Sequence, residues 1–123
     1  MTVRFIVPFS LIFTLMIVPG RAADRLSLNV SPAVAFAPAN LTIRAIVPSA
    51  PDNQAIRIVA ESPDYYRASE IGLEGDQAPR TTMLQFRALP TGTYEVTATL
   101  LGSGGHRLAI ARQQVNVVAT PRQ

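Results

Sequence analysis

Beyond residue 25 the chain alternates apolar and polar side chains, and this period of two constrains the fold more than any other feature of the sequence. In its clearest stretch, Tyr94, Val96, Ala98 and Leu100 are separated by Glu95, Thr97 and Thr99. Residues 41–47 and 56–61 show the same alternation. Because successive side chains of a strand point to opposite faces, such segments predict strands with one face buried. No segment beyond residue 25 has a sustained helical period, so the sequence predicts an all-β fold.

Turn signals divide this part of the chain into about seven short strands. The expected strands cover residues 26–30, 41–47, 56–61, 66–73, 83–87, 94–100 and 106–118. Pro32 and Pro38 place the first strand at a sheet edge, because proline cannot donate to a hydrogen-bonded ladder. In the last strand the apolar residues move from even to odd positions, so we expect a β-bulge near Arg112 to Gln114. The pattern predicts one seven-stranded antiparallel sandwich over residues 23–123.

Residues 1–22 have the pattern of a secretory signal peptide. Arg4 supplies a short positive region, and an apolar run of 14 residues follows at 5–18. Gly20 and Ala22 are small, as a signal peptidase requires, so we expect cleavage after Ala22. The alternative is a retained membrane anchor, but the run is shorter than the roughly 20 residues of a spanning helix. Either outcome predicts a periplasmic or secreted domain that touches a membrane only through this segment.

Charge and cysteine content exclude several classes of function. The 123-residue chain has no cysteine, which excludes a disulfide framework and a thiolate metal site. Its formal net charge of +3 includes Arg4 and Arg21, and without them nine arginines balance eight acidic residues to about +1. No basic patch stands out, so we expect no nucleic-acid partner. All eleven basic residues are arginine, a bias that suggests GC-rich coding and a bacterial source.

The stretch LPTGTYEVTATL, from Leu89 to Leu100, resembles the corner before the penultimate strand of immunoglobulin-like and fibronectin type III-like domains. In those families a tyrosine at this corner buries its ring and bonds its hydroxyl to nearby backbone. The resemblance implies that Tyr94 is this tyrosine, that Leu89 packs the corner and that Gly92 allows the tight turn. The chain has no cysteine pair and no tryptophan, so it differs from antibody domains and resembles bacterial immunoglobulin-like modules of the cell envelope.

Asp64, Tyr65, Tyr66 and Arg67 are the candidate binding residues. Adjacent residues of an extended segment point to opposite faces, so we expect one tyrosine in the core and the other exposed. An exposed tyrosine beside arginine has the composition of a binding hot spot. The structural alternative is that the pair is an ordinary strand start, with both tyrosines serving the fold.

No catalytic or metal-binding constellation is recognisable in the sequence, and no cofactor is expected. His106 is the single histidine and follows two glycines, so we interpret it as a solvated loop residue. The acidic residues Asp52, Glu74 and Asp76 fall in expected turns without the spacing of a calcium loop. Ordinary turn chemistry accounts for Asp52 and Asp64.

These observations favour an exported, non-enzymatic binding or structural module of the bacterial envelope that engages another envelope protein. An edge strand or the loops at one end of a sandwich can recruit such a partner. The alternative is a carbohydrate-binding or accessory subunit that serves a secreted or periplasmic enzyme. Flat exposed aromatics usually form sugar platforms, and the chain offers only three tyrosines and no tryptophan for one.

Overall fold

The structure is a computed structural model that describes residues 26–121, and this part of the chain is almost entirely β. Its strands are β1 (Ser27–Ser31), β2 (Val34–Phe36), β3 (Ala39–Ile46), β4 (Ala55–Ser62), β5 (Tyr65–Gly72), β6 (Thr81–Leu89), β7 (Gly92–Leu101) and β8 (Arg107–Val118). Two single-turn 3-10 helices, Gly75–Gln77 and Ser103–Gly105, lie in the connections. The expected all-β fold is confirmed.

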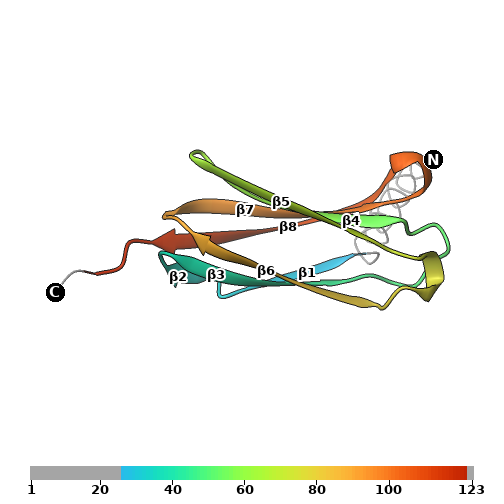
Figure 1. Ribbon diagram of the computed structural model, residues 1–123, viewed down its shortest axis with the longest axis horizontal. Coiled ribbons are helices and arrows are strands. Elements are labelled where there is room, and N and C mark those ends of the chain that lie inside the picture. The colour runs from blue at the N-terminus through green and yellow to red at the C-terminus, as the bar shows by residue number, and fades with distance from the viewer. Residues whose placement is uncertain (1–25, 122–123) are drawn as a thin grey trace, which may run out of the picture.

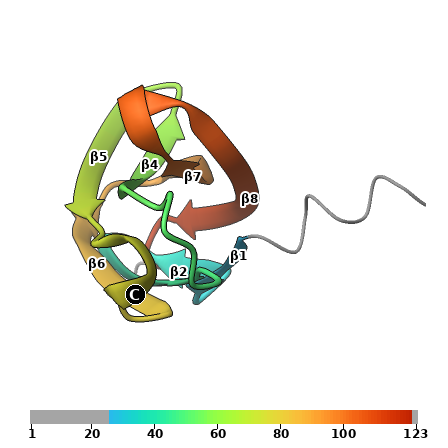
Figure 2. The ribbon, with the colours of Figure 1, turned by 90° about the vertical axis from the view of Figure 1, so that its right-hand side faces the viewer.

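The strands form two sheets that pack face to face (Figure 1). One sheet has three strands in the order β1-β3-β6, and the other has five in the order β2-β8-β7-β4-β5. Viewed from one end, β5 and β6 lie on one side of the sandwich, and β1 and β8 lie on the other (Figure 2). The β7–β8 connection is the glycine-rich loop, where Gly104 and Gly105 have φ of 70° and 80°.

The alternating side chains of both sheets meet in a single core. Its fully buried members come from β3, β4, β6, β7 and β8, and they include Leu41, Ile43, Ile56, Ile58, Phe86, Leu89, Tyr94, Val96, Leu100 and Val115. The expected inward-facing sets of β3, β4 and β7, such as the even positions of residues 94–100, are on the buried side. Apolar area removed from water stabilises such a core by roughly 25 cal/mol per Å².

The strand count of seven is wrong, because the expected first strand is two strands in different sheets. β1 pairs antiparallel with β3, whereas β2 pairs parallel with β8, so the fold is also not wholly antiparallel. Pro32 lies between them and cannot donate to a ladder, which allows the chain to leave one sheet and join the other. Both β1 and β2 lie at sheet edges, as the prolines predicted.

The predicted bulge near Arg112 to Gln114 is also wrong. β8 pairs with β7 without a shift from Ala109 to Val117, and the irregularity lies at Leu108, before this stretch. The odd positions of β8 face the core from Ala109 to Val117, whereas Arg107, before the irregularity, pairs with Leu101 and is exposed. Ile110 lies on the outer side and Gln113 on the inner side, which reverses the polarity that simple alternation assumes.

Gln113 is inward-facing because it completes the edge of the other sheet. Its Oε1 accepts a hydrogen bond from the backbone N–H of Val30 at 2.9 Å, and its Nε2 donates to the Val30 carbonyl at 2.8 Å. Val30 belongs to β1, the edge strand of the three-stranded sheet. The Gln113 side chain of the five-stranded sheet therefore makes the hydrogen bonds that a further strand beside β1 would make. This contact satisfies edge groups that would otherwise lack a partner.

The expected signal peptide, residues 1–22, lies outside the described residues. Within residues 26–121, no helix has the length and apolar character to cross a membrane.

Candidate functional site

The β6–β7 corner holds the three residues that the family resemblance singled out. The Tyr94 ring is fully buried, and its hydroxyl donates a hydrogen bond to the Pro90 carbonyl at 2.7 Å. Leu89 is also fully buried. Gly92 has no positive φ, so its smallness serves packing and not an unusual backbone angle: a Cβ there would lie 3.2 Å from Ser62 Cβ.

Tyr65 and Arg67 lean from the edge strand β5 toward this corner and the other sheet. The Tyr65 ring packs edge-on against Tyr94, with centroids 6.3 Å apart and an interplanar angle of 77°. The Arg67 guanidinium lies 5.5 Å from the centroid of the buried Phe86 ring, and its Nη1 is 3.5 Å from the Arg87 carbonyl. These side chains connect the two sheets at the open side between β5 and β6.

Tyr66 points the other way and is 61% exposed on the outer face of the five-stranded sheet. The expectation of one inner and one outer tyrosine is therefore confirmed. Asp64 is exposed in the β4–β5 turn. The four candidate residues thus do not form one surface, and only Tyr66 and Asp64 remain available to a partner without disturbing the packing between the sheets.

Strand register places Tyr66 at the end of a row that crosses four strands. Gln114 of β8 pairs with Glu95 of β7, Glu95 pairs with Glu61 of β4, and Glu61 pairs with Tyr66 of β5. We call these four residues the acidic row. Cross-strand partners have Cβ atoms about 5 Å apart, so the row presents two carboxylates between an amide and a phenol.

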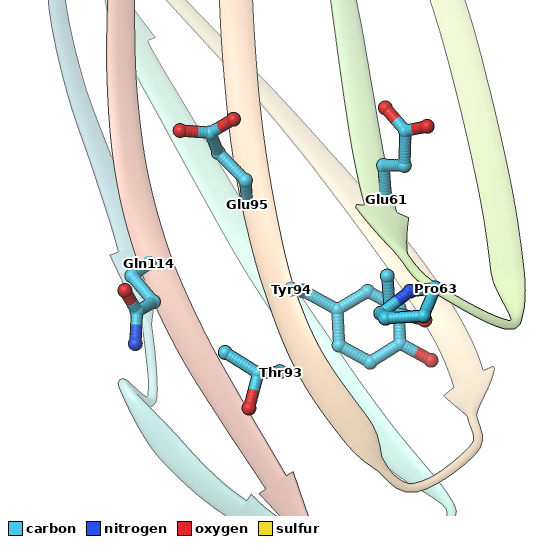
Figure 3. Close-up of a pocket in the computed structure, with 7 residues that line it drawn as sticks. Glu61, Pro63, Thr93, Tyr94, Glu95 and Gln114 are labelled. Carbon is cyan, nitrogen blue, oxygen red and sulfur yellow. The ribbon is translucent and has the colours of Figure 1, made fainter.

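A shallow hollow of about 330 Å³ lies along this row (Figure 3). Glu61, Glu95, Thr93 and Gln114 line it from three neighbouring strands, and Pro63 closes its end at the β4–β5 turn. Ser62 and the edge of Tyr94 complete the lining. The hollow therefore joins the acidic row to the turn that carries Asp64.

The two carboxylates of the row oppose each other, and neither forms an ion pair with any residue from 26 to 121. The one ion pair among residues 26–121 joins Arg57 Nη2 to Glu70 Oε1 at 3.1 Å, two rows away on the same face. Like charges directly opposite on neighbouring strands destabilise a sheet. Glu61 and Glu95 therefore leave an electrostatic cost that a bound cationic group would relieve.

Burial raises the pKa of the Tyr94 phenol above its ordinary value of 10.0. The buried phenol stays protonated at neutral pH and donates to Pro90, which makes it a structural group. His106 is exposed after the β7–β8 loop, and within residues 26–121 no three histidine or acidic side chains come together as metal ligands would. Asp52 accepts a hydrogen bond from the Ser103 hydroxyl at 3.1 Å, which ties two loops together.

The acidic row was missed in the sequence. Alternation predicted that Glu61 and Glu95 point outward, but 34 positions separate them and no local motif joins them. Only the pairing of β4 with β7 makes them neighbours. The available signal was that two expected strands each carry an outward glutamate near one end. Whether these glutamates meet depends on which strands pair and in which register.

Comparisons with known proteins identify the fold alone. No family model and no curated protein matches the sequence. A superoxide reductase (neelaredoxin) from Ignicoccus hospitalis is similar in structure, with a TM-score of 0.55 and 15% identity over 75% of this chain and 79% of that chain. A family 76 glycoside hydrolase from a bovine Bacteroides thetaiotaomicron strain is similar with a TM-score of 0.54 and 20% identity, and the match covers 75% of this chain but 20% of the hydrolase.

Proposed function

We propose that this chain is an exported, non-enzymatic immunoglobulin-like binding module of the bacterial envelope, and that it engages a protein partner through the acidic row and Tyr66. The immunoglobulin-like assignment is supported by the two-sheet order and by the Tyr94 corner with its hydrogen bond to Pro90. The envelope location is supported by the signal-peptide pattern of residues 1–22.

One observation carries the choice of surface: Tyr66 is a largely exposed aromatic residue on β5, and no strand of residues 26–121 pairs with the outer edge of β5. Tyrosine is enriched among residues that dominate binding energy, and a free edge can accept a partner strand. The neighbouring Glu61 and Glu95 suit a partner segment that carries arginine or lysine. Such a cation relieves the repulsion between the carboxylates and stacks on the tyrosine ring.

Site-specific photocrosslinking in the producing cells tests this proposal. A benzophenone amino acid replaces Tyr66 in one version of the protein and Met83 in the control, since these side chains are similarly exposed, at 61% and 58%, on opposite sheets. We expect a light-dependent protein adduct of one size from position 66 and none from position 83. The adduct should fade when Glu61→Arg and Glu95→Arg are added. Identical adducts from both positions, or none, contradict the proposed surface.

The export component has its own test. The intact mass of the protein recovered from the periplasm or medium should correspond to a chain that starts at Ala23. Recovery of the folded protein in the cytoplasm with residues 1–22 intact refutes export, whatever the crosslinking shows.

A further inference from the structure

The outer face of the three-stranded sheet is a second surface, with chemistry unlike that of the acidic row. Register arranges nine outward side chains as three rows of three. These rows are Ser27–Ile46–Thr81, Asn29–Arg44–Met83 and Ser31–Thr42–Gln85, each read from β1 through β3 to β6. With strands about 4.8 Å apart and about 3.4 Å per residue along them, the grid measures about 10 by 14 Å.

Arg44 occupies the centre of this grid and is its only charged member. Its guanidinium forms no ion pair with any residue from 26 to 121. At one corner of the grid, Gln85 Oε1 accepts a hydrogen bond at 3.0 Å from the Nε of a second cation, Arg87. Among residues 26–121, the grid therefore has a positive centre, a second cation bonded to one corner and no acidic member.

The rest of the grid consists mainly of hydroxyl and amide groups. Seven of the nine members line a hollow of about 270 Å³ around Arg44, namely Ser27, Asn29, Ser31, Thr42, Arg44, Ile46 and Met83. Ile46 and Met83 are exposed apolar side chains next to polar ones. A surface that alternates hydrogen-bonding groups with small apolar patches matches a sugar, which has hydroxyls on its rim and C–H groups on its faces.

We propose that this hollow binds a glycan whose sugars carry carboxylates. The guanidinium group of Arg44 holds one carboxylate, and the surrounding serine, asparagine and threonine side chains form hydrogen bonds with the neighbouring sugar hydroxyls. Arginine recognises a carboxylate through two parallel hydrogen bonds. A protein partner is less suited to this face, because the centre of a protein interface is mainly apolar, whereas six of the nine grid residues carry hydroxyl or amide groups and a seventh is charged. One or two cations are too few for a nucleic acid or an anionic membrane. The site uses the sheet opposite the acidic row and does not depend on the proposed protein partner.

A matched set of ligands tests the inference with the purified protein. Oligogalacturonate supplies carboxylates and hydroxyls, its methyl ester supplies the hydroxyls alone, heparin fragments supply sulfates, and polyglutamate supplies carboxylates without sugar. We expect measurable retention by a carboxylated glycan in affinity electrophoresis, with alginate and hyaluronate fragments included to vary the sugar. The methyl ester and polyglutamate should bind at least about tenfold more weakly, because each lacks one half of the recognition.

Variants then assign the binding to the grid. Arg44→Gln should weaken binding about tenfold or more, and Arg44→Lys, which keeps the charge without the fork, should fall in between. Arg112→Gln is the matched control, because Arg112 is exposed on the outer face of the other sheet. A melting temperature close to that of the unchanged protein confirms that the variants are folded.

Four results overturn the inference. Failure of every carboxylated glycan to bind removes the ligand class. Equal binding of polyglutamate indicates docking of an acidic protein, and stronger binding of heparin indicates a sulfate site. Equal losses from Arg44→Gln and Arg112→Gln indicate non-specific attraction. None of these outcomes affects crosslinking at position 66, so the two proposals fail separately.

Discussion

On the outer face of the five-stranded sheet, Glu61 and Glu95 oppose each other beside the exposed Tyr66, whereas on the three-stranded sheet Arg44 stands alone among uncharged side chains. The inner faces of both sheets are apolar because they share one core. Packing fixes the inner faces but leaves the outer faces free to differ. The comparison teaches that the two outer faces of this small sandwich differ in charge, with two opposed carboxylates on one and an arginine without an ion pair among residues 26–121 on the other.

The two sheets also differ in how their edges are completed. The smaller sheet has only three strands, and its β1 edge is held by the Gln113 side chain from the larger sheet. The larger sheet has five strands and leaves β5 free at one edge. At β1 the smaller sheet therefore relies on a side chain of the larger sheet for the Val30 backbone hydrogen bonds, whereas no strand of residues 26–121 pairs with the outer edge of β5.

The largest expected effect tests this dependence. Gln113→Ala removes both bonds to Val30 and leaves a partly buried N–H and C=O without partners. We expect a loss of about 2–3 kcal/mol in the free energy of unfolding, measured by urea denaturation. Gln114→Ala is the control, because the next residue points outward, and it should change stability by less than about 0.5 kcal/mol. Equal effects from the two variants show that the cross-sheet amide is not required.

The next largest change in the free energy of unfolding is expected at the β6–β7 corner, where Tyr94 lies beside the acidic row. Tyr94→Phe removes the hydrogen bond to Pro90 and should cost about 1–2 kcal/mol, while Tyr66→Phe on the outer face should cost almost nothing.

The same two variants should also differ in how their free energy of unfolding depends on pH. Below pH 10 the Tyr94 phenol is protonated in both states, and its contribution is complete. Above pH 10 the unfolded state loses the proton first, because burial raises the pKa of Tyr94 in the folded state above 10.0. Stability should therefore fall as pH rises through the folded-state pKa, less steeply in Tyr94→Phe than in Tyr66→Phe. Parallel pH profiles for the two variants refute the assignment.

The smallest changes in the free energy of unfolding are expected when charges on the two outer faces are removed one at a time. Glu61→Gln removes the repulsion with Glu95 and should stabilise the fold by about 0.2–1 kcal/mol at low salt, and less at high salt. Glu70→Gln breaks the ion pair with Arg57 and should act in the opposite direction by a similar amount. Arg44→Gln, which has no paired charge among residues 26–121, should leave stability unchanged. Destabilisation by Glu61→Gln would show that the row serves the fold.

Several features of the fold followed from local sequence alone. Alternation identified the inward sets of β3, β4 and β7 and the opposite directions of Tyr65 and Tyr66, because the backbone of a strand sends successive side chains to opposite faces. The gap between the expected strands at 94–100 and 106–118 contains the β7–β8 loop. Alternation failed at Ile110 and Gln113, where a contact with a distant strand reverses the expected direction.

The acidic row and the grid around Arg44 could not be predicted in this way. Alternation says which face a side chain occupies, but the neighbour across the sheet depends on register between strands far apart in the chain. Glu61 and Glu95 become partners only when β4 pairs with β7, and Arg44 meets Asn29 and Met83 only when β3 lies between β1 and β6.

By itself the sequence determined that the chain past residue 25 forms strands, which residues of most of them are buried, and that Tyr94 is a corner residue. The tertiary structure decided that the first strand divides between two sheets, that Gln113 closes an edge 83 positions away, and which outward side chains share a surface. The physical reason is that strand formation depends on local backbone geometry, whereas pairing is chosen by the core that all strands build together.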